Sequence, residues 1–134
     1  MLKLKSQTFD IQAEPQHVLA FLATTSNYAI LLPSDQTSDF QASDKQFSFK
    51  AAGQVNLALE MQSATAQSIH FIGLQSNPFA FDLNIHVLPK GAQTTGHIEI
   101  NADLNMMLKM LIEKPLQKLL VEMAANLQKA LAVE

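Results

Sequence analysis

One long helical pattern lies near the end of the chain, and most of what precedes it alternates between apolar and polar residues. From Asp103 to Leu131, apolar residues recur at steps of three and four, which places them on one stripe of a helix. Asn105 is the candidate N-cap, with Asp103 as the other candidate, because its side-chain oxygen can accept from an N–H of the first turn. The stretch therefore predicts an amphipathic helix with one buried face.

A proline interrupts this helical pattern. Pro115 has no N–H, and its ring crowds the carbonyl group of Leu111, four residues earlier. We therefore expect a break, with a short helix over 105–113 and a long helix over about 115–132 that has Pro115 in its first turn.

Seven segments are predicted to be β-strands from their alternation or from the turn residues around them. They are Lys3–Ile11, Ser38–Ala42, Gln46–Ala51, Val55–Met61, Ser68–Gln75, Phe79–Val87 and Thr95–Leu104. Two short helical segments separate the first strand from the second. One opens at Glu14-Pro15, and the other is an apolar stretch over Tyr28–Leu32 that ends at Pro33.

This order favours an antiparallel sheet with one wet face, because the alternating strands are joined by short turns. The dry face needs a cover, and the C-terminal helix is the one large amphipathic element that the pattern supplies. The predicted fold class is α+β. We expect a curved seven-stranded antiparallel sheet wrapped around the long C-terminal helix, with two short helices between strands 1 and 2.

Length and composition fit one globular unit. The chain has 134 residues, close to the commonest domain size, so we expect a single domain over 1–134. Apolar residues make up 48%, and Gly and Pro are few. No apolar run approaches the roughly 18 residues that cross a bilayer, and the opening MLKLKSQ lacks the apolar core of a signal peptide. The resulting expectation is a cytoplasmic protein without a transmembrane segment.

Two missing residue types narrow the function classes. The chain has no cysteine, which excludes thiol chemistry, disulfides and cysteine metal sites. All nine basic residues are lysine and the net charge is −3, whereas nucleic-acid binding usually shows a basic face with arginine. We therefore expect no nucleic-acid partner.

Three segments carry a resemblance to a known family. They are FDIQAEPQHVLAFLATTSNYAILLP (Phe9 to Pro33), NPFAFDLNI (Asn77 to Ile85) and ADLNMMLKMLIEKPLQKLL (Ala102 to Leu120). In this order they resemble the START-like, or SRPBCC, superfamily, also called Bet v 1-like or helix-grip. Within it they are similar to small bacterial proteins without assigned function, and the resemblance covers essentially the whole chain.

The resemblance implies a seven-stranded sheet that grips the C-terminal helix around an internal cavity. Members carry lipids, sterols, polyketides, plant hormones or similar apolar compounds. Some are cyclases, dehydratases or hydrolases, and some are co-chaperones that stimulate a partner ATPase. The superfamily shares no fixed catalytic motif, so the resemblance assigns no catalytic residue, and the fold does not decide the function.

Apolar residues on the inward helix stripe and at inward strand positions are the candidate ligand-binding residues. They are Met106, Met107, Met110, Leu111, Leu57, Leu59, Phe79, Phe81, Leu83 and, at the cavity mouth, Tyr28. Methionine is flexible and polarizable, so it suits a pocket for varied apolar molecules, but the same stripe is typical of a packed core. The pocket interpretation places Met107 or Met110 beside Phe81 in an enclosed cavity. Tyr28 either donates a hydrogen bond over the cavity mouth or leaves its hydroxyl in water.

The outward face of the last two strands carries polar chemistry. With a four-residue loop over 90–93, His86 lies opposite His97 and Asn84 lies opposite Glu99. The same register places Asp82 opposite Asn101. Two facing imidazoles with carboxylates nearby could bind a zinc-like ion. The pattern favours the simpler interpretation, a solvated convex face on which such cross-strand pairs are common, so no metal site is predicted.

No catalytic machinery is evident in the sequence. The four histidines map to a helix edge or to outward strand positions, and there is no nucleophile motif, glycine-rich phosphate loop or pair of inward carboxylates. We therefore predict no catalytic residue and no cofactor. The leading hypothesis is binding of an apolar small molecule or lipid in a cavity between the sheet and the C-terminal helix. The alternatives are an enzyme of the cyclase or hydrolase type and a protein-interaction or co-chaperone-like module.

Overall fold

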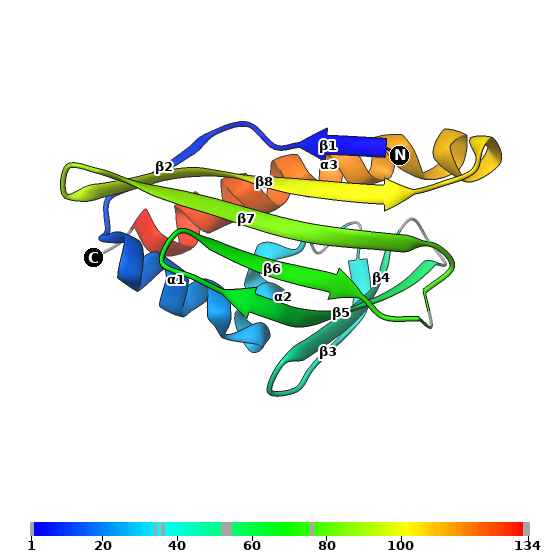
Figure 1. Cartoon of the computed structure of the whole chain (residues 1–134), viewed down its shortest axis with the longest axis horizontal. Coiled ribbons are helices and arrows are strands. Elements are labelled where there is room, and N and C mark those ends of the chain that lie inside the picture. The colour runs from blue at the N-terminus through cyan, green and yellow to red at the C-terminus, as the bar shows by residue number, and fades with distance from the viewer. Residues whose placement is uncertain (1, 34, 36, 52–54, 76, 133–134) are drawn as a thin grey trace.

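One antiparallel sheet curves over α3 (Met106–Ala132), the long C-terminal helix (Figure 1). The structure is a computed structural model that describes residues 2–33, 35, 37–51, 55–75 and 77–132. The strands are β1 (Leu2–Lys5), β2 (Phe9–Ile11), β3 (Thr37–Ala42), β4 (Gln46–Ala51), β5 (Val55–Ala64), β6 (Ser68–Gly73), β7 (Ala80–Lys90) and β8 (Gln93–Asp103). Their order is β1-β8-β7-β6-β5-β4-β3, with β2 also paired to β8. The predicted α+β fold, with the sheet around a long C-terminal helix, is confirmed.

Three short helical elements lie between β2 and β3, namely α1 (Pro15–Ala23), the 3-10 turn η1 (Thr25–Asn27) and α2 (Tyr28–Leu31). Pro15 opens α1, which suits a residue that has no N–H to pair. α2 packs against α3, where the Asn126 side chain donates to the Leu31 carbonyl oxygen over 2.9 Å. The two short helices expected before the second strand are therefore present, and α2 is held on α3.

The first predicted strand is divided into β1 and β2 by one extra residue. Lys5 lies opposite Glu99, whereas Phe9 lies opposite Gly96. The edge segment thus advances four positions while β8 advances three, which is the signature of a bulge. One continuous strand over Lys3–Ile11 is therefore wrong, and the described residues form a sheet of eight strands, seven of them in the main order.

Ser6 accounts for the bulge. Its N–H donates to the Ile98 carbonyl oxygen over 2.8 Å, and its hydroxyl oxygen accepts from the Ile98 N–H over 2.9 Å. A side-chain oxygen thus replaces one backbone acceptor, so the chain can shift register without leaving an N–H of β8 unpaired.

Gly96 lets β2 approach β8 closely. A Cβ at this position would lie 2.1 Å from the His86 carbonyl oxygen and 2.8 Å from Cζ of Phe9. Both distances are shorter than non-bonded atoms reach, so a side chain here would displace β2 or β7. The absence of a side chain is therefore a packing requirement.

The β7–β8 hairpin fixes the register of the outward polar residues. Lys90 pairs with Gln93, which leaves a two-residue turn containing Gly91 at a φ of 64°. The predicted four-residue loop over 90–93 is therefore wrong in length, but His86 lies opposite His97, so the predicted register is confirmed.

Amide side chains link α3 to the edge of the sheet beyond β8. Figure 1 shows β1 beside β8, with α3 behind them. The hydrogen bonds run from Gln117 Nε2 to the Lys5 oxygen (3.0 Å), from Gln7 Nε2 to the Val121 oxygen (3.1 Å) and from the Asp10 N–H to Gln128 Oε1 (3.1 Å). Each joins residues more than 110 positions apart in the sequence.

α3 is continuous through Pro115, so the predicted break there is wrong. Pro115 leaves the Leu111 carbonyl group without its usual N–H donor, but Leu111 is exposed and water can make that hydrogen bond. Beyond the proline the helix buries Leu120 and its neighbours against the sheet, and tertiary packing of this kind sustains helices. The predicted N-cap is confirmed, because Asn105 Oδ1 accepts from the Leu108 N–H over 2.8 Å.

Candidate functional site

A groove of about 610 Å³ opens between α3 and the strands at the β3 end of the sheet. Its apolar walls are Ile112, Leu116 and Leu119 from α3 and Ala51, Val55 and Leu57 from β4 and β5. Pro115 also lines the groove, so the position that interrupts the helical hydrogen bonding borders its opening. The groove lies at the edge opposite the one where amide side chains hold α3.

The rim of the groove is positively charged. Three lysines, Lys50, Lys114 and Lys118, and one acid, Asp35, belong to the lining. Lys50 is also paired with Asp39, with Nζ 3.3 Å from Oδ2. Since the whole chain carries a net charge of −3, this local excess of positive charge runs against the overall charge of the protein.

The groove continues toward a small inner pocket between the sheet and α3. Leu57, Leu116 and Leu119 border both spaces. The inner pocket measures about 20 Å³, roughly the room for one water molecule. The other described residues that line it are all apolar, namely Leu32, Phe47, Phe49, Leu59, Phe81, Leu83, Ile100 and Met123. The described interior is thus packed, and the open volume lies outside it.

Four predicted ligand-binding residues meet at the inner pocket, Leu57, Leu59, Phe81 and Leu83. Phe79 packs against Phe81, with ring centroids 5.5 Å apart. The structure brings these five residues together on the inner side of the sheet, and their contact with a ligand stays a prediction.

The first turns of α3 carry a group that we call the methionine turn, made of Met106, Met107, Met110 and Leu111. These side chains are 76%, 68%, 79% and 64% exposed. Figure 1 shows the start of α3 extending past the end of β8. The prediction that Met107 or Met110 lies beside Phe81 in an enclosed cavity is therefore wrong, because the sheet does not reach these turns.

Helical spacing divides the methionine turn into two sides. Met107 and Leu111 lie on the same stripe as the two groove lysines of α3, at steps of three and four residues. Met106 and Met110 align instead with Gln117, whose side chain hydrogen-bonds at β1. Met107 and Leu111 thus extend the helix wall of the groove, whereas Met106 and Met110 lie on the neighbouring side of the helix, with Met110 one turn before Lys114.

Tyr28 is fully buried, so neither position considered for it is right. Its hydroxyl donates to the Leu22 carbonyl oxygen over 2.8 Å. Its ring stacks on Phe47 with centroids 4.5 Å apart and meets Phe71 edge-on at 5.3 Å. Burial raises the pKa of Tyr28 well above its ordinary value. Tyr28 is therefore a packed core residue with its one donor satisfied.

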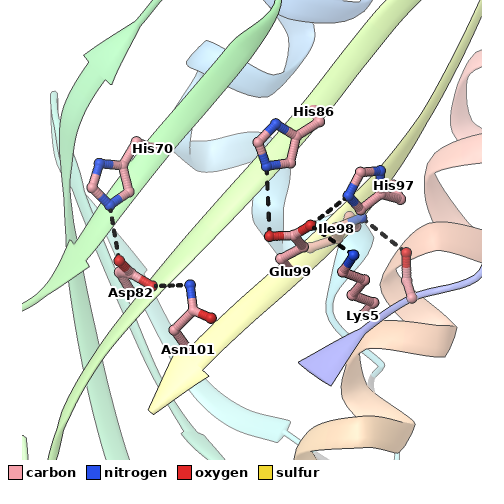
Figure 2. A network of polar contacts seen from close by, with 9 residues as sticks. Lys5, His70, Asp82, His86, His97, Ile98, Glu99 and Asn101 are labelled. Carbon is pink, nitrogen blue, oxygen red and sulfur yellow. Dashed lines mark hydrogen bonds and ion pairs between the residues drawn. The ribbon is translucent and has the colours of Figure 1, made fainter. Parts of the chain in front are cut away.

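His86, His97 and Glu99 form a compact group on the outer face, which we call the outer cluster (Figure 2). Glu99 Oε2 lies 2.7 Å from His97 Nε2, and Oε1 lies 3.7 Å from His86 Nε2. Lys5 Nζ lies 3.7 Å from Oε2. The hydrogen bond from His97 lowers the pKa of Glu99, with smaller contributions from nearby positive charge, and burial opposes them.

A second polar group lies beside the outer cluster in Figure 2. His70 Nε2 lies 3.3 Å from Asp82 Oδ2, and Asn101 Nδ2 donates to Asp82 Oδ1 over 3.0 Å. The sequence correctly placed Asp82 near Asn101 but did not join Glu99 to both histidines. The available signal was the two-residue step from His97 to Glu99, which puts them on one face of β8.

Comparison with known proteins rests on structure. No family model matches the chain, and a search of curated proteins finds no match. The solution structure of KanY matches with a TM-score of 0.75 at 20% identity, over 98% of this chain and 99% of KanY. A protein from Thermus thermophilus gives 0.72 at 14% identity over 97% of both chains, and a START superfamily protein from Mycobacterium smegmatis gives 0.68 at 14% over 96% of both.

The chain has the START-like fold. The resemblance stated from the sequence is thus confirmed for the fold, and identities this low carry no function with them. The START-like architecture also matches the di-domain ARO/CYC protein BexL from the BE-7585A biosynthetic pathway, with a TM-score of 0.64 at 12% identity. That match covers 96% of this chain and 46% of BexL. Among the described residues of this START-like chain, no helix is long and apolar enough to cross a membrane.

Proposed function

We propose that the chain, as one START-like domain over 1–134 in the cytoplasm, binds an apolar small molecule or lipid between its sheet and α3. The observation that carries this proposal is the groove of about 610 Å³, whose apolar walls share three leucines with the inner pocket. Its volume lies within the roughly 300–1,000 Å³ typical of small-molecule sites. An apolar chain bound along these walls would gain about 25 cal/mol of free energy for each Å² of apolar surface removed from water.

The proposed ligand has an anionic end. The two groove lysines of α3, Lys114 and Lys118, stand at the rim of an apolar wall, where an ammonium group and a carboxylate or phosphate form a charge-assisted hydrogen bond. Lys50 adds a third positive charge, shared with Asp39. A fatty acid or another amphiphile with one acidic group fits both the walls and the rim.

The apolar end of the ligand would widen the inner pocket. Leu57, Leu59, Phe81 and Leu83 already line that space, and Met123 closes it from α3. Methionine has three rotatable bonds and adapts to irregular shapes, so its side chain can move aside at low cost. In this proposal the packed interior is the unliganded state, and a bound chain replaces side-chain contacts with its own.

The methionine turn would contact the part of the ligand that lies outside the groove. Met107 and Leu111 share a stripe with the groove lysines, so they can cover an apolar chain there. Met106 and Met110 lie on the neighbouring side of the helix, closer to the stripe of Gln117, and serve as the internal comparison. All four residues stay candidate ligand contacts, with the first pair expected to matter more.

The primary experiment compares two probes of equal chain length. Oleate carries a carboxylate, and oleyl alcohol does not. Titration of the native chain with each probe, followed calorimetrically, should show one site that prefers oleate by about 5–10-fold, the value of one charge-assisted hydrogen bond near a surface. Native mass spectrometry of freshly purified protein checks for a co-purifying apolar molecule. Absence of binding of either probe would contradict the proposal.

Two matched double variants test the lysine rim. Lys114→Gln with Lys118→Gln should remove most of the preference for oleate and leave oleyl alcohol binding unchanged. Lys45→Gln with Lys129→Gln makes the same change in net charge away from the groove and should leave the preference intact. Equal effects of the two pairs would show a general charge effect and contradict a specific rim.

A second candidate function is protein interaction through the methionine turn. One observation favours it, since four large apolar side chains are exposed together on adjacent helical turns. Photoreactive methionine incorporated in cells should link positions 106, 107 or 110 to one other protein. Links to lipid alone, or no links, would contradict this candidate. The enzyme alternative gains no such support: the groove offers one acid, Asp35, beside its three lysines, and the described lining of the inner pocket contains no acid or base.

A further inference from the structure

We propose that the outer cluster, His86, His97 and Glu99, binds a divalent transition-metal ion of the zinc type. The cluster lies on the sheet face that α3 does not cover, since the neighbouring Ile85 and Ile98 are fully buried. The side chains of His86, His97 and Glu99 are 43%, 33% and 22% exposed, so an ion can reach them. The site is separate from the groove and does not depend on the proposed function.

The backbone sets the three residues next to one another. His86 and His97 are direct cross-strand partners, and their rings stack with centroids 4.9 Å apart at 22°. Glu99 lies two residues beyond His97, which returns it to the same face of β8. β7 pairs with β6 and β8, and β8 pairs with β7, β1 and β2, so both strands are held on both sides. Sites on such strands keep their geometry better than sites on loops.

The distances suit one ion. Each residue can offer one ligand atom so that the three atoms lie within 4.8 Å of one another. Zinc bonds of about 2.0–2.2 Å in a tetrahedral site put neighbouring ligand atoms about 3.3 Å apart. His97 Nε2 lies 2.7 Å from Oε2 of Glu99 and His86 Nε2 lies 3.7 Å from Oε1, so each imidazole has its own carboxylate oxygen near that distance. Small side-chain rotations would therefore bring the three atoms to the ion.

The donor set selects the kind of metal. Two imidazoles and one carboxylate suit zinc and its neighbours, whereas magnesium and calcium prefer oxygen ligands. The three protein ligands leave a fourth position, which faces solvent and would hold water. The ion would lie on an exposed strand surface, so we assign it a binding role and no reaction.

Two groups compete with the ion for Glu99. The His97 N–H donates to its carboxylate, and the Lys5 ammonium lies 3.7 Å away. Metal binding requires the Nε2 proton of His97 to leave or to shift to Nδ1. Lys5 is 70% exposed, so it can turn into solvent. Removing the Lys5 charge should therefore strengthen metal binding.

The neighbouring polar group supplies a matched control. His70 pairs with Asp82, but the third partner is the Asn101 amide. That group offers one imidazole and one carboxylate, one imidazole fewer than the outer cluster. His70→Ala removes a histidine from the same sheet face and leaves the proposed ligands intact.

The test is a calorimetric titration of the whole chain with zinc chloride, and with magnesium chloride as the hard-cation control. We expect one zinc per chain, no magnesium binding, and a rise of about 5–10 °C in Tm at saturating zinc. His86→Ala, His97→Ala and Glu99→Gln should each weaken zinc binding by about 10–100-fold or more. Lys5→Gln should strengthen it by about 2–5-fold, and His70→Ala should leave it unchanged.

A second readout makes each outcome decisive. In NMR spectra, the ring signals of His86 and His97 should shift with zinc, while those of His17 and His70 stay in place. No zinc binding by the native chain, or binding that survives both His86→Ala and His97→Ala, overturns the site. Each variant's Tm without metal shows that it still folds. Oleate binding should be unchanged throughout, so failure here leaves the groove proposal standing.

Discussion

The two parts of α3 on either side of Pro115 are both rich in large apolar residues, yet their surroundings are opposite. Before the proline, the four residues of the methionine turn are 64–79% exposed. After it, Leu116, Leu119 and Leu120 are 0–4% exposed. The hydrophobicity of the helix therefore does not decide burial; the reach of the sheet does. Apolar residues kept in water at one end of α3 are available for contacts that the buried end cannot make.

The largest expected effect on stability comes from shortening a side chain in the buried part of α3. Leu120→Ala removes a fully buried side chain and should lower the free energy of unfolding by about 3 kcal/mol. Met110→Ala, an equally apolar change in the exposed part, should stay within about 0.5 kcal/mol. Urea unfolding of both variants measures the contrast. Similar losses in the two would show that the methionine turn is packed in solution.

The junction between the two parts gives the next effect. Pro115→Ala restores an N–H for the Leu111 carbonyl group and removes the ring clash, so we expect about 1–3 kcal/mol of stabilisation. Slower hydrogen exchange around residues 111–115 should accompany a higher urea midpoint. A destabilised variant would mean that the proline's own contacts in the groove wall outweigh the missing hydrogen bond.

The buried side can also be examined through α2, which packs on α3. Burial raises the pKa of Tyr28 in the folded state. Its contribution to the free energy of unfolding is therefore complete below the unfolded pKa of about 10 and is lost as pH rises above that value. Between the unfolded and the folded pKa, we expect the free energy of unfolding to fall by about 1.4 kcal/mol per pH unit. Tyr28 is the only tyrosine and there is no tryptophan, so tyrosinate absorbance reports it alone. Ionisation near pH 10 (about the ordinary value) with circular dichroism unchanged would contradict its burial.

The smallest effect belongs to the start of the exposed part. Asn105→Ala removes the hydrogen bond to the Leu108 N–H, and a cap of this kind is worth about 0.5–1 kcal/mol. Because the methionine turn buries little, we expect the loss as local fraying, seen as faster hydrogen exchange over 106–110. The urea midpoint should barely move. A large shift in the midpoint would show that the first turns are coupled to the core.

Alternation was enough to predict the sheet, because a one-residue slip in any strand would turn its apolar side to water. The His86–His97 pairing followed from that constraint and from a four-residue loop expected over 90–93, and the two-residue turn of the structure keeps the same register. The bulge at Ser6 could not be foreseen, because it depends on a hydroxyl group meeting the Ile98 N–H of a distant strand. The alternation of apolar and polar residues around Ser6 gives no information on this contact between distant strands.

The groove was missed for a related reason. Residues 106–112 contain apolar side chains on every side of the helix, so periodicity could not choose the inward stripe. Leu108 and Ile112, which continue toward Leu116, form that stripe in the structure. The lysine rim depends on tertiary structure, because it joins Lys50 of β4 to Lys114 and Lys118 of α3 across the groove. Tyr28 was misplaced because its burial is set by Phe47 and Phe71, from two strands far along the chain.

The amide links between α3 and the β1–β2 edge have a consequence for synthesis. Their partners lie 112 to 118 residues apart, so the first strands leave the ribosome long before β8 and α3 exist to receive them. Until then Phe9 and Ile11, which end up buried, have no partner strand. Contacts this distant in sequence form late, so folding would finish by closing that edge. We therefore expect the β1–β2 edge to become native late, and Phe9 and Ile11 are the apolar residues that nascent-chain chaperones would protect until then.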